Sequence, residues 1–462
     1  MGFFDNHNHS EYTNALLGYP DSVCKLPDLI QRAYDLGLYG ISISEHEGLS
    51  SHIQALKYYE KMEKDRPFVL ALSNEIYLME KQEDLINREN PNTFPYYHFL
   101  LTALDTEGHH QLRLLSTRAW LRAWKQGNVY RRPTYYSDLE EIIKPNQGHV
   151  IASTACLGSR LDKMLLQEYE EGGGFNLAFE EVKRLQNIFG LDNLYLEIQP
   201  AKSTNTDQSH VNLLMWELHK RTGVPIIPTT DSHYLSKDTA FIHKVYLQSQ
   251  DGDREVDDFY ATAYLMGEDE LREYLRIDFN DKQIDKMLEW SVELGNRIGE
   301  YDIRRNPIIP QIPKEHIPKF KTQHLYKQFY NKYPAFGYYS EDSRILHERY
   351  FFYQIEKGLK AKIEDKGKNI EQYIARLNEE WTELKIISEQ LDTSMASYYS
   401  TMSSIIDLIW EADSLAMPAR GSAAGFLTCY LLEVTQIDPV PLGDYMPSWR
   451  HLNHQRGVEL PD

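Results

Sequence analysis

The chain has 462 residues, a hydrophobic fraction of 42% and a formal net charge of −20 at pH 7, a size that favours two or three domains. The negative charge disfavours tight DNA binding by the surface as a whole, because affinity for nucleic acids comes largely from Lys and Arg, although a local basic groove is compatible with an acidic exterior. No apolar run could span a membrane, no signal peptide is recognisable, and three widely spaced cysteines indicate a reducing cytoplasm rather than a disulfide framework.

Seven apolar segments in the first 235 residues are predicted as strands: 3–9, 40–46, 69–78, 98–104, 149–156, 193–199 and 224–233. Amphipathic stretches such as 26–36, 112–126 and 210–222 lie between them and are predicted as helices. This alternation indicates parallel βα units. Without a nucleotide-binding glycine fingerprint, it favours a barrel over an open sheet.

Six of the seven predicted strands carry a side chain of metal-ligand type at or near one end. These residues are His7, His9, His46, Glu75, His98, Cys156, Asp231 and His233. Any one of them alone is more often structural, but eight on six strands are hard to produce by chance. Catalytic groups of a βα barrel gather at the carboxyl ends of its strands. His98 departs from this rule because it begins its segment.

With His-x-His-Ser at His7–Ser10 and Asp-x-His at Asp231–His233, residues 3–270 resemble the PHP (polymerase and histidinol phosphatase) family. The resemblance implies a distorted seven-stranded βα barrel over residues 1–270 with a trinuclear metal site. The eight residues above would be ligands, and Asp21 is the candidate for the remaining one. Cys156 resembles the polymerase branch of the family, whereas Glu45 departs from its usual Asp before His46.

Imidazoles, carboxylates and one thiolate suit zinc, or zinc with manganese or iron, better than magnesium alone. Such metals lower the pKa of a bound water and aim the resulting hydroxide at phosphorus. The resemblance therefore implies that the barrel is a phosphoesterase. For such a domain attached to a polymerase, it implies a 3′–5′ exonuclease. The alternative, which also occurs in the family, is a domain that has lost metal ligands and serves only as a scaffold.

Residues 271–320 are predicted as a connector with a proline-rich core at 306–313. Residues 322–416 carry charge at helical spacing, for example at 370–391. We interpret these charges as solvated helix faces rather than a DNA-binding surface.

The segment Arg420-Gly421-Ser422-Ala-Ala-Gly425 precedes an apolar run over 426–432. If that run is a helix, Ser422 is a natural cap, the glycines let a phosphate approach free backbone N–H groups, and Arg420 adds positive charge. The alternative is a turn of small residues that packs a helix closely.

Together with Arg450-His-Leu-Asn453 and Leu460-Pro-Asp462, this segment resembles the palm of C-family bacterial and phage replicative polymerases, represented by the DNA polymerase III alpha subunit. Met417-Pro-Ala departs from the family's Gly-Pro-Gly. The resemblance implies that residues 321–462 are a partial, mostly helical, nucleotidyltransferase-like palm. In it Arg420, Gly421 and Ser422 would hold the phosphates of a deoxynucleoside triphosphate. Asp462 would be the first carboxylate for Mg²⁺.

Polymerisation by two metal ions needs at least two clustered carboxylates, so this chain is not expected to extend DNA alone. A C-terminal polymerase fragment, a sliding clamp and other replisome proteins are the partners that the resemblance implies, besides DNA and nucleotides. A natural split is favoured over a cloned fragment. A free-standing PHP phosphatase acting on small phosphomonoesters, and a non-catalytic module that holds a polymerase, are the competing hypotheses.

Overall fold

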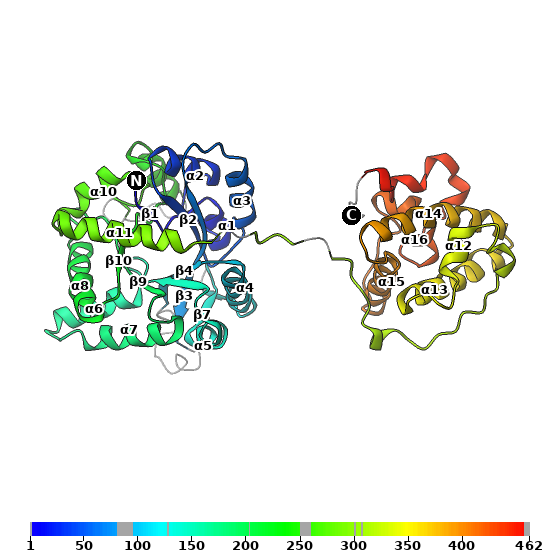
Figure 1. Ribbon diagram of the computed structural model, residues 1–462, viewed down its shortest axis with the longest axis horizontal. Helices are drawn as coiled ribbons and strands as arrows, with labels where there is room; N and C mark the ends of the chain where they lie inside the picture. The colour runs from blue at the N-terminus through cyan, green and yellow to red at the C-terminus, as the bar shows by residue number, and fades with distance from the viewer. Residues whose placement is uncertain are drawn as a thin grey trace. The chain divides into compact units, whose positions relative to one another are not determined.

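The computed structural model describes residues 2–80, 96–126, 129–202, 204–249, 260–299, 302–305 and 308–456. The chain forms two compact units, Met1–Arg304 and Arg305–Asp462, which Figure 1 shows from blue to red along the sequence.

Unit 1 is built on one strongly curved sheet. Its strands follow the order β1 (Phe4–Asp5), β2 (Gly40–His46), β3 (Val69–Met79), β4 (Tyr97–Ala103), β8 (Val150–Ser153), β9 (Leu194–Ile198) and β10 (Ile226–Pro228). The short strand β7 (Pro133–Tyr135) also pairs with β3, and β5 (Trp124–Gln126) and β6 (Val129–Arg131) form a separate two-stranded sheet within the described part of the chain. All seven predicted strand segments contain a strand of this sheet, which confirms the predicted barrel-like class.

The two ends of the sheet meet, so the barrel is nearly closed. Asn8 and Ser232 form an isolated parallel bridge, and the His9 amide donates to the Ser232 carbonyl at 3.0 Å. On the same seam the Thr230 amide donates to the Asp5 carboxylate at 3.2 Å. This closure brings the residues after β1 beside those after β10.

The direction of β4 corrects the expectation of parallel units throughout. β4 runs antiparallel to both neighbours, with Tyr97 opposite Leu78 of β3 and Leu100 opposite Ser153 of β8. The beginning of β4 therefore lies at the rim where the other strands end. His98, which seemed misplaced at the start of its strand, lies at that rim for this reason.

Helices cover the outside of the sheet (Figure 1). They are α1 (Tyr12–Leu17), α2 (Leu26–Asp35), α3 (His52–Lys61), α4 (Thr106–Leu121), α5 (Tyr136–Ile142), α6 (Arg160–Glu170), α7 (Asn176–Phe189), α8 (Thr206–Thr222), α9 (Ala240–Gln248), α10 (Glu268–Leu275) and α11 (Asp281–Arg297). The predicted helix over 112–126 starts earlier, because Asp105 caps α4 by accepting from the Gly108 amide at 2.8 Å. It also ends earlier, at Leu121.

Helix α11 lies within the stretch predicted as a connector, residues 271–320. Asn280 caps it by accepting from the Gln283 amide, and it buries Ile284, Met287 and Leu294. It packs against β1 and β10, so the compact barrel unit extends past residue 270. The proline-rich segment 306–313 lies beyond α11, whose regular apolar face packs onto the barrel.

Unit 2 is helical, as predicted. Its α-helices among the described residues are α12 (Pro334–Tyr339), α13 (Leu346–Lys362), α14 (Ile370–Gln390), α15 (Ala396–Glu411) and α16 (Leu427–Leu431). Trp381 of α14 is fully buried among Phe336, Tyr339 and Phe351. Among the described helices of either unit, none is both long and apolar enough to cross a bilayer.

Candidate functional site

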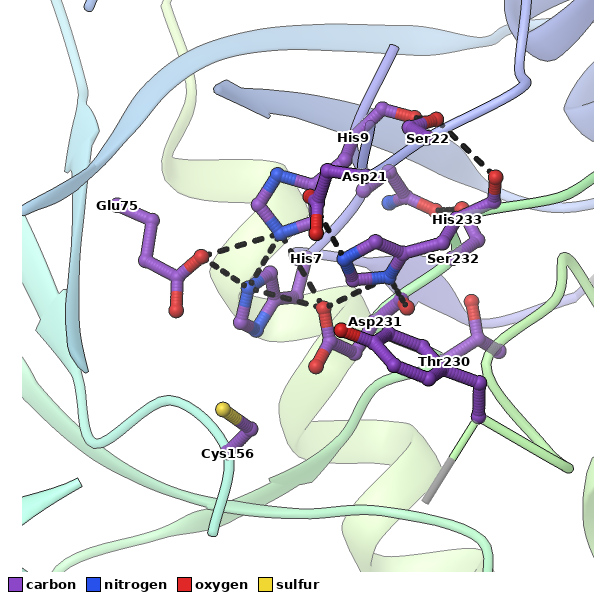
Figure 2. Close-up of polar contacts among 12 residues, drawn as sticks. His7, His9, Asp21, Ser22, Glu75, Cys156, Thr230, Asp231, Ser232 and His233 are labelled. Carbon is purple, nitrogen blue, oxygen red and sulfur yellow. Dashed lines mark hydrogen bonds and ion pairs between the residues drawn. The ribbon is translucent and has the colours of Figure 1, made fainter. Parts of the chain in front are cut away.

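Nine polar side chains converge at the rim of the barrel described above. They come from segments as distant as residues 7 and 233, and Figure 2 shows most of them pointing toward one another. They are all the predicted ligands: His7, His9, Asp21, His46, Glu75, His98, Cys156, Asp231 and His233.

Glu75 lies at the centre of this cluster. Its Oε2 lies 2.9 Å from His46 Nδ1, 3.1 Å from His9 Nε2 and 3.3 Å from His7 Nε2. Its Oε1 lies 2.7 Å from His98 Nδ1. One buried carboxylate is therefore shared by four imidazoles.

Two aspartates complete the cluster on its other side. Asp231 Oδ1 lies 3.2 Å from His9 Nε2 and 3.4 Å from His7 Nε2. Asp21 Oδ2 lies 3.2 Å from His233 Nε2 and 3.6 Å from His46 Nε2. Asp21 thus reaches the centre from the loop after α1, where Asn14 Oδ1 accepts from its amide at 2.7 Å.

Cys156 marks the edge of the cluster. Its Sγ lies 3.4 Å from His98 Nδ1. The side chain of His98 is 23% exposed, whereas those of His7 and His9 are fully buried. Solvent therefore reaches the cluster from the His98 side.

The chemistry of this donor set fits metal ions. Three groups of residues offer ligand atoms within 4.8 Å of one another: His9, His46 and His233; His7, His9 and Glu75; and His46, Glu75 and His98. The buried oxygens Glu75 Oε1 and Oε2, Asp21 Oδ2 and Asp231 Oδ1 meet imidazole nitrogens only as ion pairs and make no well-directed hydrogen bond among the described residues. Buried charge without hydrogen bonds is costly unless it is paired or bound to metal. Several cations shared by these carboxylates and imidazoles would remove that cost.

In unit 2, the segment Gly421–Gly425 forms a 3₁₀ helix, η8, that leads into α16. Ser422 does not cap α16, which corrects the prediction; its Oγ lies 3.1 Å from His451 Nδ1. The first amides of α16 are already satisfied, because buried Glu380 accepts from Leu427 N at 2.6 Å and from Thr428 N at 3.0 Å. A phosphate would therefore meet the glycine turn rather than the start of α16.

Gly421 and Ser422 line a cavity of about 460 Å³ together with Arg450. Arg420 is exposed and is not among the residues that line it. Asp462, the predicted carboxylate, lies outside the described residues.

Residues 5–201 match the PHP domain model, and residues 349–462 match the model of the bacterial DNA polymerase III alpha NTPase domain. The chain therefore carries a PHP domain and a DNA polymerase III alpha region. Over 99% of its length it is 36% identical to the "DNA-directed DNA polymerase" of Bacillus phage SPbeta and to "Probable DNA polymerase YorL" of Bacillus subtilis (strain 168), and it covers 36% of each. It is 27% identical to the DNA polymerase III subunit alpha of Aquifex aeolicus (strain VF5), again covering 36% of that protein. The chain thus spans about a third of these relatives.

The charges of the PHP cluster control its protonation. Burial disfavours a charged His9, yet the carboxylates of Asp231 and Glu75 beside its Nε2 raise its pKa to about 10. Against the same burial, the pKa of His7 is raised by Asp231, Glu197 and Glu75. The pKa values of Asp231 and Glu75 are held well below their usual range by the surrounding imidazoles, although burial alone would raise them.

Glu197 is a functional residue of the PHP domain that the sequence analysis missed. It lies on β9, the one predicted strand without an assigned ligand, and its Oε1 lies 2.6 Å from His7 Nδ1. Thr229 Oγ1 and Ser153 Oγ donate to it at 2.6 and 2.9 Å. A lone acid within the apolar run Leu194–Ile198 was the available signal. Glu197 therefore orients His7 and leaves Nε2 facing the cluster.

Replacing Glu197 with Ala is expected to weaken metal binding by about 10- to 100-fold, the usual effect of losing a carboxylate that orients a ligating histidine. The variant should still bind the same number of ions at saturation, because every direct donor remains. Metal titrations of the wild type and the variant would measure the change. An unaltered affinity would show that the His7–Glu197 contact does not support the site.

Glu45, which replaces the family's usual Asp, also has a positioning role. Its carboxylate accepts hydrogen bonds from both the amide and the hydroxyl of Ser10. Burial raises its pKa to about 6, against the lowering effect of Ser10 and His9. Glu45 thereby holds the turn that follows His9.

Proposed function

We propose that the PHP domain of this chain is a metal-dependent phosphodiesterase that removes 3′ nucleotides from DNA, as a 3′–5′ exonuclease. The observation that carries the proposal is the convergence of nine ligand-type side chains at one solvent-accessible rim. The similarity to DNA polymerases supports DNA as the substrate. We also propose that the protein acts in the cytoplasm.

The donor set selects the metals that we propose. Imidazoles with one thiolate favour zinc, and the carboxylates also accept manganese or iron. His7, His9, Asp21, His46, Glu75, His98, Cys156, Asp231 and His233 would hold three ions. When bound, such ions activate water and stabilise the charge that develops on a phosphodiester. The protein orients the ligands through Glu197 and Glu45 and leaves the His98 side open to substrate.

For unit 2 we propose binding of a deoxynucleoside triphosphate with Mg²⁺. The Gly421–Ser422 turn and Arg450 would contact the phosphates, Arg420 would add positive charge, and Asp462 would be one metal ligand. Primer extension, a C-terminal polymerase partner and contacts with a sliding clamp are proposals for a complete polymerase of this type. These proposals concern parts of a polymerase outside the third of the relatives' length that this chain covers.

The deciding experiment uses a 5′-labelled primer–template with a mispaired 3′ end, incubated with the chain and Mn²⁺ or Zn²⁺. We expect stepwise shortening of the primer that EDTA abolishes, and that falls by at least about 100-fold in His9→Ala. His110→Ala is the matched control, because His110 contacts Arg113 outside the cluster. Equal shortening by wild type and His9→Ala would identify a contaminating nuclease and overturn the proposal. Hydrolysis of phosphomonoesters but not of DNA would instead support a small-molecule phosphatase.

Metal binding by the PHP domain is expected to release protons. His9 has a pKa of about 10 without metal, so it is charged at neutral pH and must lose its proton to become a ligand. Each proton released makes the apparent affinity rise about tenfold per pH unit, here from about pH 6 to about pH 8. Calorimetric titration in buffers with different ionisation enthalpies would count the protons. Affinity independent of pH would show that the free site is already deprotonated.

A further inference from the structure

The cavity of about 460 Å³ in unit 2 has one wall of which the proposed phosphate contacts use only Arg450. Gly421, Ser422 and Gly425 form one side, and the segment 445–450 forms the other. Its volume lies in the range that encloses small organic ligands. A triphosphate alone would need Arg450 but not the aromatic part of the second wall.

The two walls are held together by groups on α14. Arg376 donates from Nη2 to the Gly425 carbonyl at 2.8 Å and to the Met446 carbonyl at 2.9 Å. A Cβ on Gly425 would lie only 3.1 Å from the Pro447 carbonyl oxygen, so a larger residue there would push the two walls a few tenths of an ångström apart. Glu380 anchors Arg376 through Nε at 3.1 Å. Arg376 and Glu380 of α14 therefore hold the two walls of the cavity together.

Two aromatic side chains line the second wall. Tyr445 is 89% exposed and Trp449 is 47% exposed, so part of each ring faces the cavity or solvent. The guanidinium of Arg450 lies 5.8 Å from the centre of the Trp449 ring. A flat apolar surface thus adjoins the cation and glycine turn that would hold phosphate. Aromatic rings of this kind stack nucleobases with little preference for sequence.

We propose that Trp449 and Tyr445 contact the base and sugar of a nucleoside triphosphate whose phosphates lie at Gly421, Ser422 and Arg450. The inference rests on the proposed nucleotide-binding function of unit 2 and adds the part of the nucleotide that the second wall recognises. Trp449 provides the stacking surface, and Tyr445 borders the open side. Because stacking does not read hydrogen bonds, all four deoxynucleotides should bind alike.

The test compares two probes on the full chain: dATP with Mg²⁺, and inorganic tripolyphosphate with Mg²⁺. We expect Trp449→Ala to weaken binding of dATP by about 5- to 100-fold, the range for losing one base stack, and to leave binding of tripolyphosphate unchanged. Trp449→Phe should recover most of the affinity for dATP. Trp410→Ala is the matched control, because Trp410 on α15 is 43% exposed and does not line the cavity. Arg450→Ala should weaken both probes.

The outcomes separate this inference from the function on which it rests. If Arg450→Ala weakens both probes but Trp449→Ala changes neither, the phosphate site stands and the role of the aromatic wall is wrong. A single-stranded DNA oligonucleotide serves as a further probe. If Trp449→Ala weakens its binding but not that of dATP, the wall binds a DNA strand, and the inference is overturned. If the wild-type chain binds neither probe, the proposed nucleotide site itself fails.

Discussion

Replacing Glu75 with Gln is expected to empty the PHP metal centre and to reduce phosphodiester hydrolysis by at least about 100-fold. The change keeps the shape of the side chain but removes the negative charge that four imidazoles share at 2.7 to 3.3 Å. Without that charge, metal ions in the cluster would lose their central carboxylate ligand. The metal content after gel filtration, measured by mass spectrometry, should fall together with the rate.

Stability measurements would show whether Glu75→Gln acts through the metal. A metal at 100 times its dissociation constant stabilises the folded state by about 2.7 kcal/mol, so added Zn²⁺ should raise the melting temperature of the wild type but not of the variant. Glu141→Gln is the control, because Glu141 is 63% exposed and pairs only with Arg118 among the described residues. A variant that keeps its metal but loses activity would instead make Glu75 a catalytic group and not a principal ligand.

Replacing Glu380 with Ala is expected to destabilise unit 2 by about 3–5 kcal/mol, the usual cost of removing one partner of a buried charged pair. Glu380 is fully buried and accepts from Leu427 N, Thr428 N and Thr428 Oγ1 while it pairs with Arg376. Alanine would leave these donors without an acceptor. Urea unfolding, followed by hydrogen exchange of peptides from each unit, would locate the loss in unit 2.

Two further variants make this prediction specific. Glu380→Gln should cost less, because burial raises the pKa of Glu380 against the lowering effect of Thr428 and Arg376, and a neutral amide can still accept one of the hydrogen bonds. Protonation of Glu380 in the folded state contributes to the free energy of unfolding. This contribution is fully present below the pKa that Glu380 has in the unfolded chain, and it is lost as the pH rises through the higher pKa of the folded state. Glu371→Ala, on the exposed side of the same helix, should change little. Equal stability of Glu380→Ala and wild type would contradict a structural role for Glu380.

The sequence by itself determined the parts of this protein that depend on local order. Apolar segments that alternate with amphipathic ones located the seven main strands of the barrel but not the short strand β7, because strands buried on both faces have nearly continuous apolar sequences. The same order placed His7 and His9 on one face and put acids and imidazoles at strand ends. All nine predicted ligands therefore lie in one cluster.

Tertiary structure alone decided what depends on pairing between distant segments. No local pattern records that β4 runs antiparallel, yet that direction brings His98 to the rim. Glu197 became part of the site only because β9 passes behind His7. Ser422 turned to His451 instead of capping α16, because Glu380, more than 40 positions away, already satisfies that helix start. At the start of α16 a long-range hydrogen bond thus replaced the local cap, since a buried donor must be satisfied by whichever acceptor the fold brings within reach.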